Sequence, residues 1–420
     1  MYTPKGLRTL KFLAIIATLQ TLVTSLVFWP SVSIAENYIK LRTDLESELS
    51  QSLDSTNIRH LKTVQCILKH INWEYEIRSS PVKRNRILTR KNEIDGFFLH
   101  SPRLMPDTIA KTSQPIAIER WFMFQRKSGD NSNNTGDPSV SAVLGSNEHH
   151  WLEQHNYKKI ITAPNLSSVV KMLHRERVTY ALADQKRFWR NVFLTETPAG
   201  KFSAYFVRYA PLVMYFSNEF IEKNPDFLNH FNSNIDSCTQ DRLKPTKEEA
   251  QHLLNIQEGI LRKDGNQINL ATIIKAQLED RTSVANQKEE DKRWTVAKEQ
   301  ETRTKLMDQI EDNALSDFLR RLTRLGNSKI SEIFVMDTDG YILGMNRATS
   351  DYWQGDEAPY KSIMENRQRQ HISEIDFDAS TQKFQIQITI PIKDPETQRI
   401  IALMTTGFDA DIALTSAFDF

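Results

Sequence analysis

Short segments of alternating apolar and polar residues are interspersed with helical patterns over residues 38–241. Residues 38–42 and 73–77 alternate at every second position, which is typical of half-buried strands. Between them, apolar residues recur at steps of three and four over residues 58–71, which predicts an amphipathic helix. Strand, helix and strand at this spacing predict a right-handed crossover between parallel strands, and therefore an α/β sheet.

The pattern changes near Thr246, where helix formers begin to dominate. Opposite charges spaced four residues apart over residues 281–305 are typical of a helix face exposed to solvent. An apolar stripe follows over residues 306–325. Gly326 and Asn327 suit left-handed backbone, so a long helix is predicted to end there.

A period of two returns after residue 326. Residues 330–336, 341–345, 384–392 and 400–408 are predicted strands. The sequence Asp-Thr-Asp-Gly at 337–340 predicts a hairpin turn; a calcium loop would need a third acidic ligand and a distant glutamate. With residues 351–369 as a connecting helical segment, the pattern predicts a small antiparallel sheet behind a long helix.

Composition limits the class of protein. The chain has 420 residues, 39% hydrophobic and 25% charged, which predicts a globular protein of two or three domains. Its 54 basic and 53 acidic residues nearly cancel, which argues against a nucleic-acid partner. Two cysteines exclude a disulfide scaffold and a four-thiolate zinc site.

The N-terminus predicts export. Lys5, Arg8 and Lys11 precede an apolar run at residues 12–29, and residues 33–35 supply small side chains for cleavage. This pattern predicts a cleavable signal peptide over residues 1–35, and an uncleaved N-terminal membrane anchor is the alternative. In a Gram-negative source, the rest of the chain is then expected in the periplasm.

Several segments in the first part of the chain share an order and spacing with one family. These are residues 80–84, 93–98 and 112–116, followed by residues 144–146, 172–178, 215–217 and 224–232. Because of these segments, residues 36–245 resemble the family 3 extracellular solute-binding proteins. The resemblance implies a bilobal, periplasmic-binding-protein-like α/β domain. Lobe one would take residues 36–123 and about 208–245, lobe two would take the part between, and the lobes would close on a small ligand.

The same resemblance implies two ligand-binding positions. Where amino-acid-binding members place an arginine for the ligand carboxylate, this chain has Asp107, which would favour an amine instead. Asp184 occupies the position at which members often place the carboxylate that meets the ligand's amino group. The alternatives are that Asp107 caps a helix and that Asp184 is a surface acid.

The last part of the chain resembles the PDC or Cache sensor domains, which are PAS-like and periplasmic. The likeness is carried by residues 333–340, 349–357, 387–392 and 401–405. It implies a helical connector and long helix over residues 246–326 and a sensor domain over residues 327–420.

An acidic and aromatic block is the candidate ligand site of that sensor domain. Tyr352 and Trp353 lie beside Asp351, Asp356 and Glu357, and such a group is suited to enclose a cationic or zwitterionic amine. The alternative is that the two aromatic residues anchor the loop onto the sheet.

The two cysteines are predicted to form a disulfide. Cys66 lies on the first predicted helix, and Cys238 follows a segment that should return to lobe one. In an oxidising compartment, such a bond closes a long loop and contributes roughly 2–4 kcal/mol.

No catalytic motif was found, so the chain is predicted not to be an enzyme and to need neither cofactor nor metal. The histidines at 149, 150 and 155 are read as part of a polar helix start. Two ligand-binding-type domains without a recognisable output domain predict a secreted sensory protein that reports ligand occupancy to a separate membrane partner. The alternative is a solute-binding receptor of an ABC-type importer.

Overall fold

The computed structural model describes residues 37–44, 55–102, 104–127, 138–239, 243–263, 267–280, 286–378 and 383–415. The predicted signal peptide lies outside the described residues. In the described part of the chain, no helix combines the length and apolar character needed to cross a membrane.

Lobe one begins with the predicted strand–helix–strand unit. β1 (Tyr38–Thr43) and β2 (Glu74–Ser79) pair in parallel and are joined by α2 (Ser55–His70), which confirms the prediction. α3 (Val82–Arg90) leads from β2 to β3 (Gly96–His100), which pairs with the other side of β1. Alternate residues of β1 are buried, as its sequence pattern requires.

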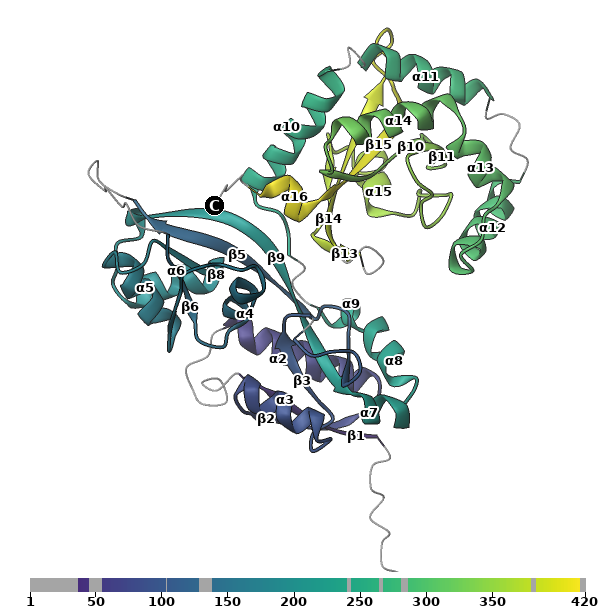
Figure 1. Cartoon of the computed structure of the whole chain (residues 1–420). Helices are drawn as coiled ribbons and strands as arrows, with labels where there is room; N and C mark the ends of the chain where they lie inside the picture. The colour runs from purple at the N-terminus through teal and green to yellow at the C-terminus, as the bar shows by residue number, and fades with distance from the viewer. Residues whose placement is uncertain are drawn as a thin grey trace, which may run out of the picture.

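Two long strands connect the lobes. One end of β9 (Phe202–Ser217) pairs with β3 and β4 (Ala110–Thr112) in lobe one. Its other part runs antiparallel along β5 (Ala117–Arg126), which also pairs with β8 of lobe two. Figure 1 shows both strands passing between the lobes, so they form the hinge. The resulting nine-stranded sheet has the order β2-β1-β3-β9-β5-β8-β6-β7, with β4 on β9.

Lobe two is a second α/β unit on the same sheet. Its parallel strands are β6 (Val140–Val143), β7 (Ile160–Ala163) and β8 (Tyr180–Asp184). Its helices are α4 (Asn147–Gln154), α5 (Leu166–His174) and α6 (Gln185–Leu194).

The chain then returns to lobe one, where the predicted disulfide is present. After β9 come α7 (Asn218–Lys223), α8 (Phe227–Ser233) and α9 (Ile235–Cys238). Cys66 of α2 and Cys238 of α9 are bonded, with their Cα atoms 5.7 Å apart. This bond ties the returning segment to the first helix.

The connector differs from the predicted long helix. The residues described there form a series of shorter helices: α10 (Lys247–Lys263), α11 (Gln267–Asp280), α12 (Gln287–Glu299), α13 (Lys305–Glu311) and α14 (Ala314–Leu325). The breaks have local causes. Glu301 has a φ of 53°, and the side chains of Thr304 and Asn313 cap the starts of α13 and α14. The prediction failed because capping residues interrupt the apolar stripe.

The C-terminal sheet is antiparallel, as predicted. It has the order β11-β10-β15-β14-β12, with β13 also on β14. The strands are β10 (Ile330–Asp337), β11 (Ile342–Met345), β12 (His371–Ile372), β13 (Asp376–Asp378), β14 (Lys383–Lys393) and β15 (Ile400–Asp409). The short strands β12 and β13 were not predicted. Helix α16 (Ala410–Leu414) follows β15.

The predicted helical segment at residues 351–369 is helical only in α15 (Ala358–Met364). Asp291 Oδ1 accepts hydrogen bonds from the amides of Tyr352 and Trp353 at 3.0 and 2.8 Å. These bonds hold the preceding residues as a loop.

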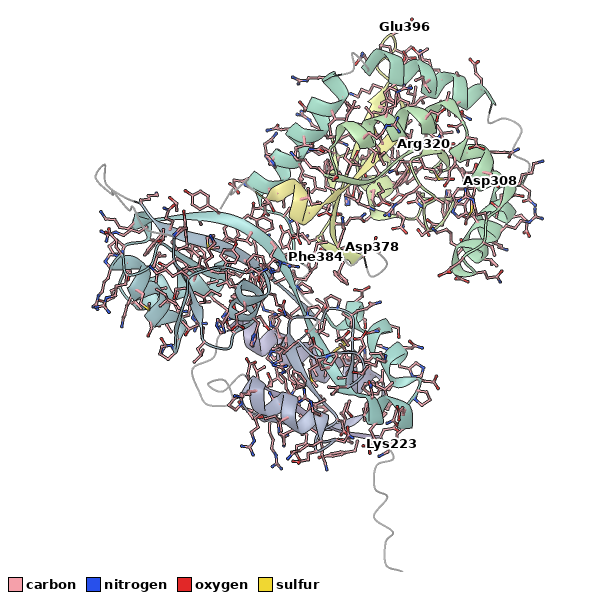
Figure 2. All side chains as sticks on the ribbon, in the orientation of Figure 1. Lys223, Asp308, Arg320, Asp378, Phe384 and Glu396 are labelled. Carbon is pink, nitrogen blue, oxygen red and sulfur yellow. A yellow bond between two sulfur atoms is a disulfide. The ribbon has the colours of Figure 1, made fainter. Side chains whose placement is uncertain are left out.

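The C-terminal sheet shares its hydrophobic core with the hinge. Phe206 and Tyr209 of β9 belong to the same buried cluster as Leu253 of α10 and Phe384 of β14. The rings of Tyr209 and Phe384 lie 5.8 Å apart. Figure 2 shows Phe384 on the side of the C-terminal sheet that faces the two lobes. The C-terminal part is therefore packed on a strand that connects the lobes.

Candidate ligand-binding cleft

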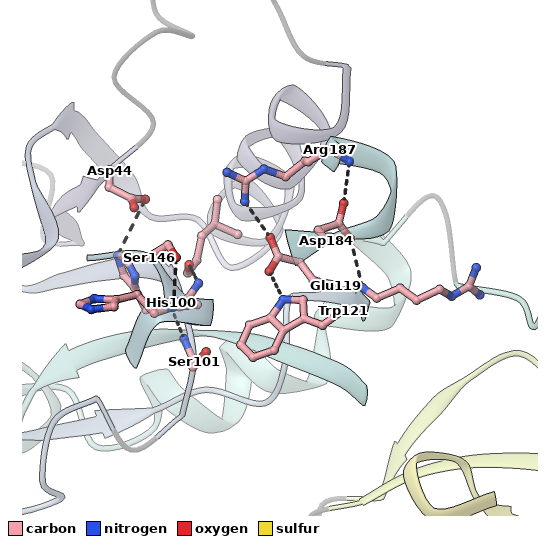
Figure 3. Close-up of polar contacts among 12 residues, drawn as sticks. Asp44, His100, Ser101, Glu119, Trp121, Ser146, Asp184 and Arg187 are labelled. Atoms are coloured by element: carbon pink, nitrogen blue, oxygen red, sulfur yellow. Dashed lines mark hydrogen bonds and ion pairs between the residues drawn. The ribbon is translucent and has the colours of Figure 1, made fainter. Parts of the chain in front are cut away.

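Strand ends from both lobes meet in one cluster of polar side chains. Asp44 follows β1 and His100 ends β3 in lobe one, while Ser146 follows β6 and Asp184 ends β8 in lobe two. Figure 3 shows these residues together. Because ligands of α/β proteins bind outside the carboxyl ends of strands, this meeting place is the candidate cleft.

Asn147 bridges the two lobes. Its Oδ1 accepts a hydrogen bond from the Ser101 amide at 3.0 Å, and its Nδ2 donates to the Leu99 carbonyl at 3.2 Å. Leu99 has a φ of 71°, and the register of β3 on β9 shifts between Phe98 and His100. Left-handed backbone at a leucine costs on the order of 1–3 kcal/mol and is held by its surroundings. The lobes are therefore joined by a polar bridge at a strained position.

An ionic group lies near the start of β5 and α6, where the side chain of Glu119 is 11% and that of Arg187 is 36% exposed. Glu119 Oε1 is 3.3 Å from Arg187 Nη1, and Glu119 Oε2 accepts a 2.8 Å hydrogen bond from Trp121 Nε1 (Figure 3). Burial, followed by the negative charge of Glu148, raises the pKa of Glu119 to about 8, although Arg187 opposes the shift. Burial alone would lower the pKa of Arg187, but the surrounding carboxylates raise it.

Glu148 is the second buried carboxylate of this group. It lies in the first turn of α4 and is 6% exposed. Its negative charge raises the pKa of both Glu119 and Arg187.

Asp184 is a buried helix cap. Its Oδ1 accepts a hydrogen bond from the Arg187 amide at 3.0 Å, and its Oδ2 accepts one from the Arg120 amide at 3.1 Å. It is 8% exposed, so the alternative of a surface acid is wrong. Each carboxylate oxygen keeps a second lone pair, which leaves acceptor capacity for a ligand.

Asp107 does not join this cluster. It lies in an exposed turn before β4, where no helix begins, so the capping alternative is wrong. Its carbonyl accepts a 3.0 Å hydrogen bond from Asn218 Nδ2. Asp107 thus precedes β4 in lobe one, whereas Asp184 ends β8 in lobe two.

His100 faces the cleft from lobe one. It is 2% exposed, and its Nε2 lies 3.9 Å from Asp44 Oδ1. Burial lowers its pKa, and Asp44 opposes that shift only in part. The imidazole is therefore neutral at pH 7.

A cavity of about 200 Å³ adjoins the ionic group. Its wall contains Glu119, Asp184 and Arg187, the Cys66–Cys238 disulfide of lobe one, and residues 374–377 of the C-terminal part. Sites for drug-sized ligands are commonly about 300–1,000 Å³, so this cavity suits a smaller molecule. All three parts of the chain contribute to it.

Arg120 and Asp411 fix the C-terminal part to the hinge. Arg120 of β5 donates from Nη2 to the Lys244 carbonyl at 2.9 Å and lies 3.3 Å from the Glu249 carboxylate. Its guanidinium lies over the Tyr209 ring, 5.6 Å from the centroid. The Tyr209 amide donates to Asp411 Oδ1 of α16 at 2.8 Å. Both crossing strands therefore carry the C-terminal part.

The acidic and aromatic block does not form the predicted cage. Tyr352 is 1% exposed, and its ring lies 5.6 Å from that of Trp294. Trp353 Nε1 donates to the Asp339 carbonyl at 2.9 Å. The two aromatic residues anchor the loop, as the alternative interpretation held, and the ring of Tyr352 is closed to a ligand.

The acids of that block do gather. One carboxylate oxygen from each of Asp351, Asp356 and Glu357 lies within 4.8 Å of the others. Burial raises the pKa of Asp351 and of Glu357. Asp351 already accepts hydrogen bonds from Ser350 and Gln354. Without the aromatic faces, these acids alone do not define a ligand site.

The histidine pair begins α4 after the capping residue Ser146, as predicted. Glu153 provides a carboxylate that the sequence did not reveal, 3.6 Å from His149 Nε2 and 3.2 Å from His150 Nδ1. His149 Nδ1 accepts a 3.2 Å hydrogen bond from the Gly145 amide. The neutral ring then carries its proton on Nε2, the atom that a metal would need.

Sequence reasoning missed Glu119, Arg120, Glu148 and Arg187. One signal was available: Glu119 and Arg120 interrupt the apolar segment 116–124, and charges within a central strand require partners. The position of Glu148 carries no comparable signal, because acidic residues are common in the first turn of a helix.

No protein-family model and no curated protein matches the sequence. Solved structures that match part of the chain are periplasmic ligand-binding and sensor domains. A histidine kinase sensor domain with similarity to periplasmic binding proteins is 11% identical, with 48% of this chain and 90% of that chain covered and a TM-score of 0.38. An ancestral arginine-binding protein bound to arginine is 14% identical, with 49% and 94% covered and a TM-score of 0.38. The periplasmic VFT2 domain of Bordetella pertussis BvgS is 15% identical, with 48% and 92% covered and a TM-score of 0.35.

Proposed function

We propose that this protein is a periplasmic sensory protein. A small molecule binds between the two lobes, and a C-terminal domain of the PDC or Cache type passes the bound state to a separate membrane partner. The protein itself carries out no catalysis. The observation that carries this proposal is the attachment of the C-terminal sheet to the hinge strands β5 and β9.

Ligand closure of a bilobal domain changes the strands that connect its lobes. Here those strands also hold the C-terminal part, through Arg120 on β5 and through Tyr209 on β9. A ligand changes a distant element only if it binds one of two conformations, open or closed, more tightly, and if the distant element is coupled to which of them is favoured. The shared core and these polar contacts support the proposal, because a change in the two strands would alter them.

The cavity supports the same proposal, because residues 374–377 form part of its wall. A ligand that fills it contacts or adjoins the C-terminal part directly. A receptor that only delivers a solute to an importer needs two lobes and a cleft, and has no use for a third part placed against both hinge and cavity.

An uncoupled variant separates sensing from transport. Asp411→Ala removes the acceptor for the Tyr209 amide and the 3.9 Å pairing with Arg208, away from the cavity wall. Deletion of the gene is expected to change transcription of the genes that the sensory pathway controls. In the deletion strain, we expect Asp411→Ala not to restore normal transcription, whereas Asp226→Ala, at an exposed position, restores it. Solute uptake should be normal in all strains. An uptake defect that Asp411→Ala repairs would contradict sensing and favour the ABC-type importer receptor.

A further inference from the structure

We propose that the cavity of about 200 Å³ binds a small anion, through carboxylate or phosphate oxygens, between Lys62 of lobe one and Lys186 of lobe two. The inference deepens the proposed function and rests on it in that a small molecule enters between the lobes. It names the charge of that ligand and the two side chains that recognise it.

Two lysines from opposite lobes line this one cavity. Lys62 lies on α2 and Lys186 lies in the first turn of α6, and both belong to the cavity wall. Both residues are exposed, and within the described part of the chain neither ammonium has a hydrogen bond or an ion pair. Single lysines without a partner are common on protein surfaces. Two that line the same cavity from different lobes are placed to attract one anion.

The acidic residues of the wall, in contrast to the two lysines, already have interactions. Asp184 accepts hydrogen bonds from two backbone amides, and the Glu374 carboxylate lies 3.7 Å from Lys244 Nζ. The acidic residues with interactions of their own are Glu119, Asp184, Asp236, Glu374 and Asp376. The arginines of the wall have partners as well. Among the described residues, the charges of the wall without a partner are therefore the two ammonium groups.

Further N–H donors of the wall also suit an anion. Residues 184–187 bring the N-terminal end of α6, a helix of ten residues, to the cavity, and that end of a helix carries a partial positive charge. Arg120 is 9% exposed, and its Nε has no hydrogen-bond acceptor in the part of the chain that the structure describes. The oxygens of an anion accept hydrogen bonds from such donors, whereas a cationic ligand would be repelled by the two lysines.

Binding of one anion by both lysines would join the two lobes. Without an anion, the two ammonium groups repel each other, and this repulsion opposes closure of the lobes. An anion between them replaces the repulsion with attraction, so it binds the closed conformation more tightly than the open one. The residues that recognise the ligand's charge would therefore also couple its binding to the hinge.

The test measures binding to the full chain at low ionic strength, by calorimetry and thermal shift. The probes are succinate and inorganic phosphate as anions, and 1,4-diaminobutane as a cation. We expect at least one anion to raise the melting temperature, and its affinity to fall as salt is added. Binding of succinate alone would identify the ligand group as carboxylate, and binding of phosphate alone would identify it as phosphate; either result supports the proposal.

Substitutions at the two lysines test the site itself. Lys62→Gln and Lys186→Gln should each weaken anion binding by about fivefold or more, because each removes a charge-assisted hydrogen bond that solvent only partly screens. The controls are Lys69→Gln on α2 and Lys171→Gln on α5, which are exposed and lie outside the cavity wall, and both should leave the affinity unchanged.

Several results would overturn the inference. They are a panel in which neither anion binds, tighter binding of 1,4-diaminobutane than of either anion, and unchanged anion affinity in both wall variants. A loss in only one of the two variants would place the anion on a single lobe and would also overturn it. The sensory proposal is tested separately by Asp411→Ala, whose expected phenotype does not depend on the ligand's charge.

Discussion

Replacing Arg120 with methionine should loosen the C-terminal part from the hinge. Methionine keeps most of the apolar stem and removes the guanidinium. The change deletes the hydrogen bond to the Lys244 carbonyl, the ion pair with Glu249 and the contact with the Tyr209 ring. Because the side chains of Arg120 and Glu249 are only 10% and 12% exposed, solvent screens their interaction weakly.

The size of the effect depends on the interactions that Glu249 retains in the variant. Breaking a buried ion pair costs about 3–5 kcal/mol when the remaining charge has no other partner. Glu249 Oε2 still accepts a 2.7 Å hydrogen bond from the Thr246 amide, so its charge is not left alone. We therefore expect Arg120→Met to lower the free energy of unfolding by about 2–3 kcal/mol, near the value for hydrogen bonds to charged groups.

Urea unfolding followed by tryptophan fluorescence measures this loss, since Trp121 is the neighbouring residue. Arg293→Met is the control for an exposed pair, because the Arg293 side chain is 62% exposed where it meets Glu290, and it should cost no more than about 1 kcal/mol. Adding Glu249→Gln should show a coupling of about 1–2 kcal/mol in a double-mutant cycle. A loss below about 0.5 kcal/mol for Arg120→Met, the range of ordinary surface substitutions, would refute the reasoning.

Three further predictions concern the cleft and lobe one. Asn147→Ala removes the hydrogen bonds that Asn147 makes to Leu99 and Ser101 of lobe one, so X-ray scattering should show a larger radius of gyration than for wild type; an unchanged radius would mean that the bridge does not hold the lobes together. The pKa of Glu119 is raised to about 8 in the folded chain, so the folded state favours the protonated carboxyl. Its contribution to the free energy of unfolding is therefore full below pH 4.5 and is lost as pH rises toward 8. The loss is at most about 1.4 kcal/mol per pH unit. Urea unfolding at pH 5.5 and 7.5 should show this decline, and Glu119→Gln should flatten it; equal slopes in the two proteins would contradict the assignment. Replacing Cys66 and Cys238 with serine opens a bond between residues 172 apart in sequence and should cost about 2–5 kcal/mol, whereas an unchanged melting temperature would contradict that role.

Local patterns predicted most of the fold. Residues 38–42 alternate and lie in β1, residues 74–77 of the second predicted strand lie in β2, and the apolar stripe over 58–71 lies largely in α2. The connector was mispredicted because the capping side chains of Thr304 and Asn313 interrupt an otherwise helical pattern. Helix propensity and hydrophobic periodicity do not indicate whether a single capping side chain will interrupt a long apolar stripe.

The cleft was less predictable, because its residues meet only through the topology. Glu119 lies on β5 and Arg187 on α6, and their 3.3 Å contact depends on the pairing of β5 with β8, the strand that leads into α6. Tyr352 shows the opposite case: its neighbours in sequence suggested a ligand cage, but the ring packs on Trp294, 58 residues earlier in the chain, and is buried. Residues that are close in sequence therefore predicted a ligand site around Tyr352 that the structure does not form. The residues of the cleft are distant in sequence and were not predicted to meet.

Hydrogen–deuterium exchange, with and without a small molecule that raises the melting temperature of the protein, tests the central claim most directly. The peptides of interest cover the hinge at residues 203–212 and the end of the C-terminal sheet at 405–414, which the Tyr209–Asp411 hydrogen bond joins. If ligand binding between the lobes is passed to the C-terminal part, exchange should change in both peptides together, and Asp411→Ala should abolish the change at 405–414 alone. Ligand protection confined to the lobes, with exchange at 405–414 unaltered in the wild-type protein, would contradict the account.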